Sequence, residues 1–342
     1  MEGVRKAVGS LGQIHLAPGQ TKEVHVPVAA ACLEEAGERI IIISLLLAKD
    51  YRWAQHGHEI AWEQFEISQY HDRPQPNRNW GLPSLNFCSE NFIVTGEEFS
   101  VTVNRKKGAL SSFVYQGREY IAQALVPNTW RTPNDNQMRN NYLEKYATWR
   151  EAVNQLRVVD ISPTAEEDRV SLRFCTQLPG LARYEMRYAI AGDGLIEITV
   201  KFHPVSDSIP PMPRLGLRLG LARVFNRVVW YGRGPHETHC DRKLGAKIGL
   251  NESSLGELHH PYVRPQLNGN RTDVRWVKLH DGNQCAGRCS KVTIEAGARA
   301  QEMPDNSKWA VFDGLTPKAQ WFSKASIEGG AGCRACLGLN FS

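Results

Sequence analysis

The chain has 342 residues, of which 42% are hydrophobic and 23% are charged. These values are close to those of ordinary globular proteins, so the chain can bury a sizeable core and general disorder is excluded. At this length we expect a small domain and a large one.

The net charge of +5 comes from 41 basic and 36 acidic side chains spread along the chain. Nucleic-acid-binding proteins concentrate Lys and Arg on one face, so we expect no nucleic-acid partner. The longest apolar run, 40–48, is far shorter than the roughly 20 residues that span a bilayer, and residues 1–20 contain no apolar signal segment. The eight irregularly spaced cysteines do not indicate a disulfide framework. We therefore predict a cytoplasmic protein with no membrane partner.

Residues 1–70 predict a small β-sandwich module. Polar and apolar side chains alternate over 15–28 around a Pro-Gly-Gln turn, which predicts strands there, and the β-branched run 39–47 predicts another. The aromatic and branched segment 56–67 fits a further strand. Residues 71–83 contain three prolines and several Asn and Asp residues, which predict a linker between this module and a second domain over 84–342.

The second domain is predicted to be a large antiparallel β-sandwich. Short β-type runs recur at intervals of about 8 to 15 residues, without long amphipathic helices between them, which argues against a repeated βα fold. The predicted strands are 99–104, 110–115, 170–176, 184–190, 195–202 and 215–221. Only 141–153 has helical periodicity, with Tyr142, Tyr146 and Trp149 on one face. The fold class is therefore all-β.

Complete catalytic and metal-binding motifs are not found in the sequence. The segment from His236 to His239 differs from a zinc-protease motif because its histidines are not four residues apart. Cys285, Cys289, Cys333 and Cys336 are arranged more like buried free thiols than like a zinc ribbon. No nucleophile elbow or phosphate-binding loop is present. We predict no metal or cofactor bound by this chain itself.

Polar and aromatic clusters in predicted turns are the candidate functional residues. Turns on a rigid sheet often carry recognition, and Trp, Tyr, Asn, Asp and Arg side chains suit stacking on sugars and bonding to their hydroxyls. Pairing that only staples the loops together explains the same clusters. The candidates are Trp130, Arg131, Asp135, Asn136, Tyr231, His236, Glu237, Asp241, Arg242, Tyr262, Arg264 and Asn268.

Four segments together resemble the C-terminal region of bacterial-type β-galactosidases of glycoside hydrolase family 2. They occur in the family's order and are 57–65 (GHEIAWEQF), 130–136 (WRTPNDN), 230–237 (WYGRGPHE) with Asp241-Arg242, and 261–269 (PYVRPQLNG). The resemblance implies that 1–70 is part of an immunoglobulin-like domain, without its first strands. It also implies that 84–342 is a β-supersandwich related to galactose mutarotases, the small-chain domain of these enzymes.

The resemblance also implies where catalysis lies. In this family the two catalytic glutamates and the magnesium ligands belong to a barrel domain, and none of them can be assigned to a residue here. We therefore expect a small-chain or C-terminal portion of an enzyme that hydrolyses terminal β-D-galactosides such as lactose. It should not hydrolyse alone and should need a catalytic barrel chain as partner, with magnesium on that chain.

The tail departs from the family pattern. Segment 327–338 (IEGGAGCRACLG) resembles only loosely a late loop that helps form the galactoside pocket in relatives, and Trp321 is not at the position of that loop's tryptophan. The expected closing strands do not follow, so sheet edges would be exposed and would favour aggregation, an oligomer or dependence on a partner.

Other functions stay open at this point. The mutarotase-like architecture favours a stand-alone carbohydrate-binding module or an aldose epimerase, in which a His acid and a Glu or Asp base would interconvert anomers. The only candidates for these roles are His203, His236 and Glu237. The shortened ends also fit a non-functional gene fragment.

Overall fold

The structure is a computed structural model in which two compact units are separated, Met1–Pro76 and Asn77–Ser342. The described residues are Gly3, 5–28, 37–68, 81–206, 208–209, 212–264 and 266–281, with the backbone alone of 285–296 and 321–328. The predicted domain limits at residues 70 and 84 stay predictions, since residues 69–80 lie outside the described part. Within the described residues, no helix is long and apolar enough to cross a membrane.

The first unit contains one antiparallel hairpin, formed by β1 (Arg39–Leu46) and β2 (Glu59–Ser68). Both strands were predicted and are confirmed. The predicted strands over 15–28 are wrong: the turn forms, with the amide of Gln20 donating to the carbonyl of Ala17 at 3.0 Å, but the flanking residues are not in strands and pair with no strand in the described part of the chain. Alternating side chains make a strand only where a partner accepts its backbone hydrogen bonds.

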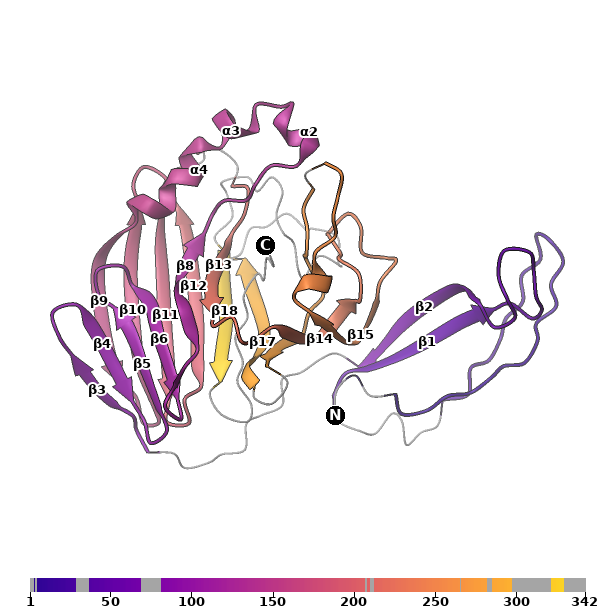
Figure 1. Cartoon of the computed structure of the whole chain (residues 1–342), viewed down its shortest axis with the longest axis horizontal. Helices are drawn as coiled ribbons and strands as arrows, with labels where there is room; N and C mark the ends of the chain where they lie inside the picture. Colours follow the sequence, from indigo (N-terminus) through magenta and orange to yellow (C-terminus); the bar gives the residue numbers. More distant parts are fainter. Residues whose placement is uncertain are drawn as a thin grey trace. The chain divides into compact units, whose positions relative to one another are not determined.

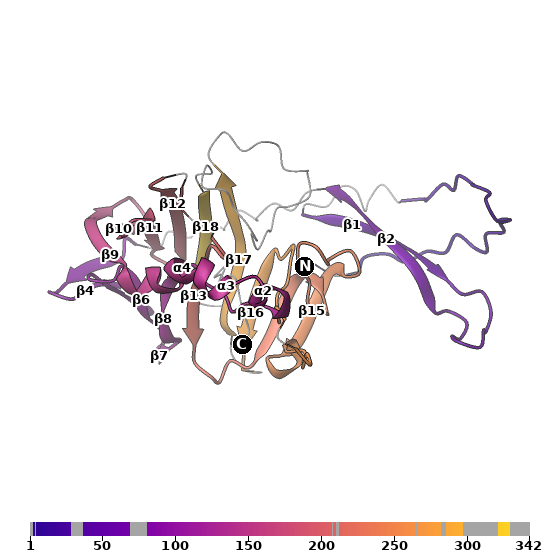
Figure 2. The same cartoon turned by 90° about the horizontal axis from the view of Figure 1, so that it is seen from above.

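The second unit is built on antiparallel sheets, which confirms the all-β prediction (Figures 1 and 2). The largest has nine strands, in the order β15 (Lys247–Ser254), β14 (Arg227–Gly234), β16 (Trp276–His280), β17 (Cys285–Ala296), β18 (Trp321–Glu328), β12 (Ile196–Pro204), β11 (Ala182–Ala191), β10 (Arg169–Leu178) and β9 (Arg157–Ala165).

Two smaller sheets accompany it in the same unit. One has five strands, β3 (Ser84–Phe87), β4 (Asn91–Thr95), β5 (Phe99–Asn104), β6 (Ala109–Tyr115) and β7 (Arg118–Glu119); the other pairs β8 (Ile121–Asn128) with β13 (Gly216–Leu221). All six strands predicted for this domain are confirmed.

Period-two alternation places one face of each sheet in a shared core. Along β12 the apolar side chains from Ile196 to Phe202 are buried at every second position, while the polar ones between them are partly exposed. Phe174 of the large sheet packs edge-on against Phe92 of the five-stranded sheet, with ring centroids 6.1 Å apart. The hydroxyl of Tyr188 donates to the carbonyl of Gly108 at 2.9 Å, which joins the same two layers.

Short helices cross one end of this sandwich (Figure 2). They are α2 (Asp135–Met138), α3 (Tyr142–Lys145), α4 (Ala147–Ala152) and the 3₁₀ turn η1 (Val153–Gln155). A second 3₁₀ turn, η2 (Gly256–Leu258), follows the end of β15, beside the start of β14. The predicted helix over 141–153 is confirmed, with an interruption at Tyr146, whose φ of −115° and ψ of 13° leave the α region. Tyr142 and Trp149 are buried, as their spacing predicts.

Phe174 tests whether the two layers share one core. We expect Phe174→Ala to lower the free energy of unfolding by about 3–5 kcal/mol, because its fully buried ring leaves a cavity between the sheets. Urea unfolding of the full chain measures this. The matched control is Phe87→Ala, which removes a mostly exposed ring and should cost less than about 1 kcal/mol. Equal losses in the two variants would contradict the shared core.

Candidate functional site at the loop edge of the sandwich

Three of the four sequence segments converge on one edge of the second unit. Strand β14 ends at Gly234 and is followed by the loop 235–246. The loop 259–275 leads into β16, which runs antiparallel beside β14 with Tyr231 opposite Trp276, so the loop arrives at the end of β14. The loop 129–134 leads into α2 at the same edge (Figure 1). Segment 57–65 belongs to the first unit.

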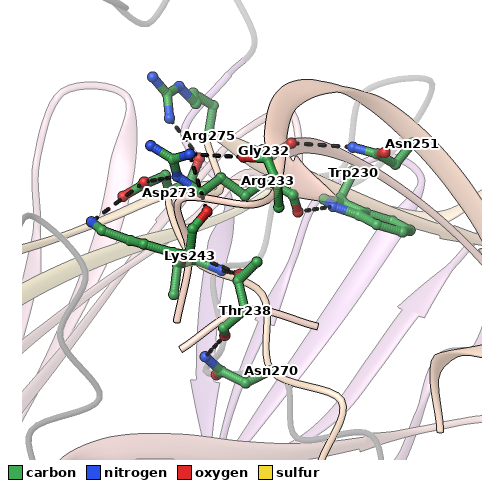
Figure 3. Close-up of polar contacts among 11 residues, drawn as sticks. Trp230, Gly232, Arg233, Thr238, Lys243, Asn251, Asn270, Asp273 and Arg275 are labelled. Carbon is green, nitrogen blue, oxygen red and sulfur yellow. Dashed lines mark hydrogen bonds and ion pairs between the residues drawn. The ribbon is translucent and has the colours of Figure 1, made fainter. Parts of the chain in front are cut away.

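A buried ion pair holds two of these loops together (Figure 3). The Nε of Arg233 donates to a carboxylate oxygen of Asp273 at 2.5 Å, and both side chains are largely buried, 16% and 12% exposed. The Nη1 of Arg233 also donates to the carbonyls of Ala246 at 2.7 Å and Lys243 at 3.3 Å. The ammonium of Lys243 lies 3.5 Å from the same carboxylate. The charges of Arg233 and Asp273 are thus paired and their polar atoms are hydrogen bonded, as a buried ion pair requires.

The backbone at the pair is shaped to bring the loops close. Asp273 has a φ of +51°, a left-handed conformation that Asp tolerates better than most residues. A Cβ on Gly232 would lie only 2.7 Å from the Cα of Val274, so a side chain there would force the strand and the loop apart. The indole N–H of Trp230 donates to the carbonyl of Arg233 at 2.9 Å, which fixes the end of β14.

Threonine and asparagine side chains extend this attachment below the ion pair (Figure 3). The hydroxyl oxygen of Thr238 accepts a hydrogen bond from the amide of Thr272 at 2.8 Å, and the two hydroxyls are also 2.8 Å apart. The amide of Thr238 donates to the carbonyl of Asn270 at 2.8 Å, and the side chain of Asn270 donates back to the carbonyl of Thr238 at 2.7 Å. Loop 235–246 is therefore bonded to loop 259–275 along several residues.

Glu237 is the most heavily engaged of the predicted residues. One carboxylate oxygen accepts hydrogen bonds from the hydroxyl of Tyr262 and, at 2.5 Å, from the guanidinium of Arg242, while the other accepts from the amide of Gly269 at 3.0 Å. Burial acts to raise the pKa of Glu237, but the bonds from Tyr262, Gly269 and Arg242 together outweigh it and hold the pKa below its ordinary value. Glu237 is thus an ionised tie between loops, poorly suited to act as a general acid.

His239 lies beside this tie. Its side chain is buried, and its Nε2 atom hydrogen bonds to no residue that the structure describes. Burial lowers the pKa of His239, and the charge of Arg242 lowers it further, against opposing contributions from Glu237, Asp241 and a hydrogen bond with the backbone of Leu267. The ring is therefore neutral at pH 7.

An ion pair joins the 130–136 segment to the loop 259–275. The guanidinium of Arg264 lies 3.1 Å from the carboxylate of Asp135, at the start of α2. Asn134 caps this helix: its side chain accepts from the amide of Gln137, whose own side chain accepts from the amide of Asn134. The side chain of Gln137 also accepts a hydrogen bond from the guanidinium of Arg131 at 2.8 Å, so the buried Arg131 is bonded to the helix.

The remaining candidates are placed as follows. Trp130 packs on Tyr142 with ring centroids 5.2 Å apart, and Tyr231 is buried against Trp276. Asn268 exchanges hydrogen bonds with the backbone of His260, and therefore shapes its own loop. Asn136, His236 and Asp241 are exposed, as are Arg242 and Arg264.

The structure does not bring His203 together with His236 and Glu237. His203 lies on β12, which is separated from β14 by β16, β17 and β18. Four inter-strand steps of about 4.8 Å put the two strands on the order of 19 Å apart. This distance is too great for an acid and a base that act on one sugar carbon.

Comparison with known proteins decides the family. The family model described as β-galactosidase small chain matches residues 95–315, and the model of β-galactosidase domain 4 matches residues 2–68. The chain belongs to the β-galactosidase family.

Individual relatives agree. A β-galactosidase of Priestia megaterium is 33% identical over 78% of this chain, one of Clostridium acetobutylicum is 30% identical over 70%, and one of Lactobacillus delbrueckii is 30% identical over 86%. The matches cover 26%, 27% and 30% of those proteins. The chain thus spans little more than a quarter of the length of these curated β-galactosidases and corresponds to their C-terminal, small-chain region.

Sequence reasoning named the outer residues that tie the edge together but missed the buried pair of Arg233 and Asp273 and the threonines beside it. Arg233 lies inside a recognised segment, but its partner Asp273 is 40 residues away and outside every segment. Thr238 and Thr272 gave no signal, since lone threonines occur throughout sequences. Within the described residues, no three His, Cys, Asp or Glu side chains are grouped so that they could hold a metal ion. The cysteines from Cys285 onward have no described side chains.

Removing Glu237 tests its role as a tie. We expect Glu237→Ala to lower the free energy of unfolding by about 1–3 kcal/mol, because the buried amide of Gly269 and the hydroxyl of Tyr262 lose their acceptor. The matched control is Glu252→Ala, which removes the half-exposed partner of Arg227 and should cost at most about 1 kcal/mol. Urea unfolding at pH 7 compares the two, and a smaller loss at Glu237 than at Glu252 would argue against the tie.

The depressed pKa of His239 predicts acid sensitivity. Below the ordinary histidine value of 6.5, the unfolded chain takes up a proton that the folded ring accepts less readily, so stability contributed by neutral His239 falls as the pH falls. We expect His239→Phe, which cannot titrate, to lose less stability between pH 7.5 and pH 5.5 than the unaltered chain. Urea midpoints at the two pH values measure this, and equal losses would contradict it.

Proposed function

We propose that this chain is the accessory, C-terminal portion of a β-galactosidase and supports hydrolysis of terminal β-D-galactosides only together with a catalytic barrel chain. Its part would be structural, and the loop edge defined by 129–134, 235–246 and 259–275 would also form part of the substrate rim. The catalytic glutamates and the magnesium site would belong to the partner. A cytoplasmic location fits this role.

The observation that carries the proposal is the engagement of the carboxylates at the loop edge. Hydrolysis of a glycoside needs two carboxyl groups facing one sugar, roughly 5 to 9.5 Å apart, one of them able to hold a proton. Glu237 is tied by Tyr262, Arg242 and Gly269, Asp273 by Arg233, and Asp135 by Arg264. Asp241 is exposed, but a single carboxylate does not make the required pair. An edge at which Glu237, Asp273 and Asp135 are committed to neighbouring loops supports a scaffold better than a self-contained active site.

The proposal includes the domain types that the family resemblance implies. We propose that residues 1–70 belong to an immunoglobulin-like domain and residues 84–342 to a mutarotase-like supersandwich. An aldose epimerase is the less favoured function, because three strands separate the strand of His203 from β14 and Glu237 is held ionised within its tie.

Complementation tests the proposal. The purified chain alone should not turn over a chromogenic β-galactoside, and it should confer turnover when mixed, with magnesium, with the Priestia megaterium β-galactosidase from which the matching quarter has been removed. The truncated enzyme alone is the control. Turnover by the isolated chain, or no gain on mixing, would overturn the proposal. Polarimetry of freshly dissolved α-galactose with the same sample reports any epimerase activity.

A further inference from the structure

The loop edge carries apolar side chains that the fold leaves in solvent. Val263 is 103% exposed and Leu244 is 82% exposed, the highest values among the large apolar side chains of the described second unit. Met138 of α2 and Leu143 of α3 are also exposed. Soluble proteins bear scattered exposed apolar residues, so one such residue does not indicate a contact surface. What indicates one here is the position of several of them at one edge, together with the contacts of their neighbours.

Val263 is held out by its two neighbours. The hydroxyl of Tyr262 on one side donates to the carboxylate of Glu237, and the guanidinium of Arg264 on the other side pairs with Asp135 at 3.1 Å. Tyr262 is therefore bonded to loop 235–246 and Arg264 to α2. The side chain between them is presented to solvent on a segment whose two flanking side chains contact other elements.

Leu244 is presented in the same way. The carbonyl of its neighbour Lys243 accepts a hydrogen bond from Arg233 at 3.3 Å, and the ammonium of Lys243 lies 3.5 Å from the carboxylate of Asp273. Two residues further on, the carbonyl of Ala246 accepts from Arg233 at 2.7 Å. The short arch that carries Leu244 is thus fixed at both ends by the buried ion pair.

Fixed apolar side chains next to cations are typical of protein contact surfaces. A group that is already ordered loses little conformational freedom on binding, and buried apolar and Arg side chains supply much of the binding energy of interfaces. The guanidinium groups of Arg242 and Arg264 are more than half exposed beside these apolar side chains. A partner that fits would offer apolar pockets bordered by carboxylates.

We propose that this edge is the surface on which the catalytic chain docks, with Val263 and Leu244 as its central contacts. We define the docking edge as Met138, Leu143, Arg242, Leu244, Val263 and Arg264. The identity of the docking partner rests on the proposed function. The chain spans about a quarter of the length of its relatives, and the partner would be a chain that corresponds to the other three quarters. The arrangement of the edge itself rests only on the contacts above.

Charge substitution at the two central positions tests the docking edge. Val263→Asp and Leu244→Asp, singly and together, should each weaken binding to the truncated Priestia megaterium enzyme by about tenfold or more in Kd, since a carboxylate would enter an apolar, acid-bordered contact. Isothermal titration calorimetry measures the Kd, and chromogenic turnover at limiting concentration gives a second readout. Both substituted side chains are exposed, so urea midpoints should stay unchanged.

Val224→Asp is the matched control. Val224 is a 46% exposed valine that precedes β14, at the end of this strand opposite to the docking edge, and its substitution should leave the Kd within about twofold. Normal binding by the Val263 and Leu244 variants would overturn the docking edge and leave the proposed function intact. No binding by the unaltered chain would overturn the proposed function and this occupant together. A homodimer of the isolated chain that Val263→Asp dissociates would assign the edge to a second copy instead.

Discussion

The buried pair of Arg233 and Asp273 is the interaction on which the loop edge depends. It joins the end of β14 to the loop before β16, and its spare donors hold the arch of Lys243 and Ala246. A charge left alone in this place would cost several kcal/mol, so the two residues constrain each other strongly. The outer contacts of Glu237 build on a backbone that this pair has already fixed.

The architecture was predictable because its signal is local. The alternation of buried and partly exposed side chains in strands such as β5 and β12 follows from neighbouring residues in the sequence. The helical spacing of Tyr142 and Trp149 is a local pattern too. The strands expected over 15–28 show the limit of this reasoning, because alternation describes one strand and not its partner. The order of four segments indicated the family, and the comparisons confirm that family.

The site was predictable as a set of loops but not as a network. Glu237, Arg242 and Tyr262 were named as candidates either for facing a sugar or for stapling the loops together, and the structure bonds them to one another. Asp273 was not named at all, since its only sequence signal is an ordinary Asp between Thr and Val. Pairing across tens of residues arises from the fold, and composition or spacing cannot show it. The polar loops are therefore bonded to one another, and Val263 lies in solvent between two residues that take part in these contacts.

Hydrogen exchange tests most directly whether the ion pair governs the edge. In the unaltered chain, the amides of Arg233, Thr238, Gly269 and Thr272 should exchange slowly, because each donates across the loops. In Asp273→Asn, which keeps a residue tolerant of positive φ but removes the charge, these amides should lose protection together while those of β10 and β11 keep theirs. Unchanged protection at the edge, or loss at one loop alone, would contradict the account.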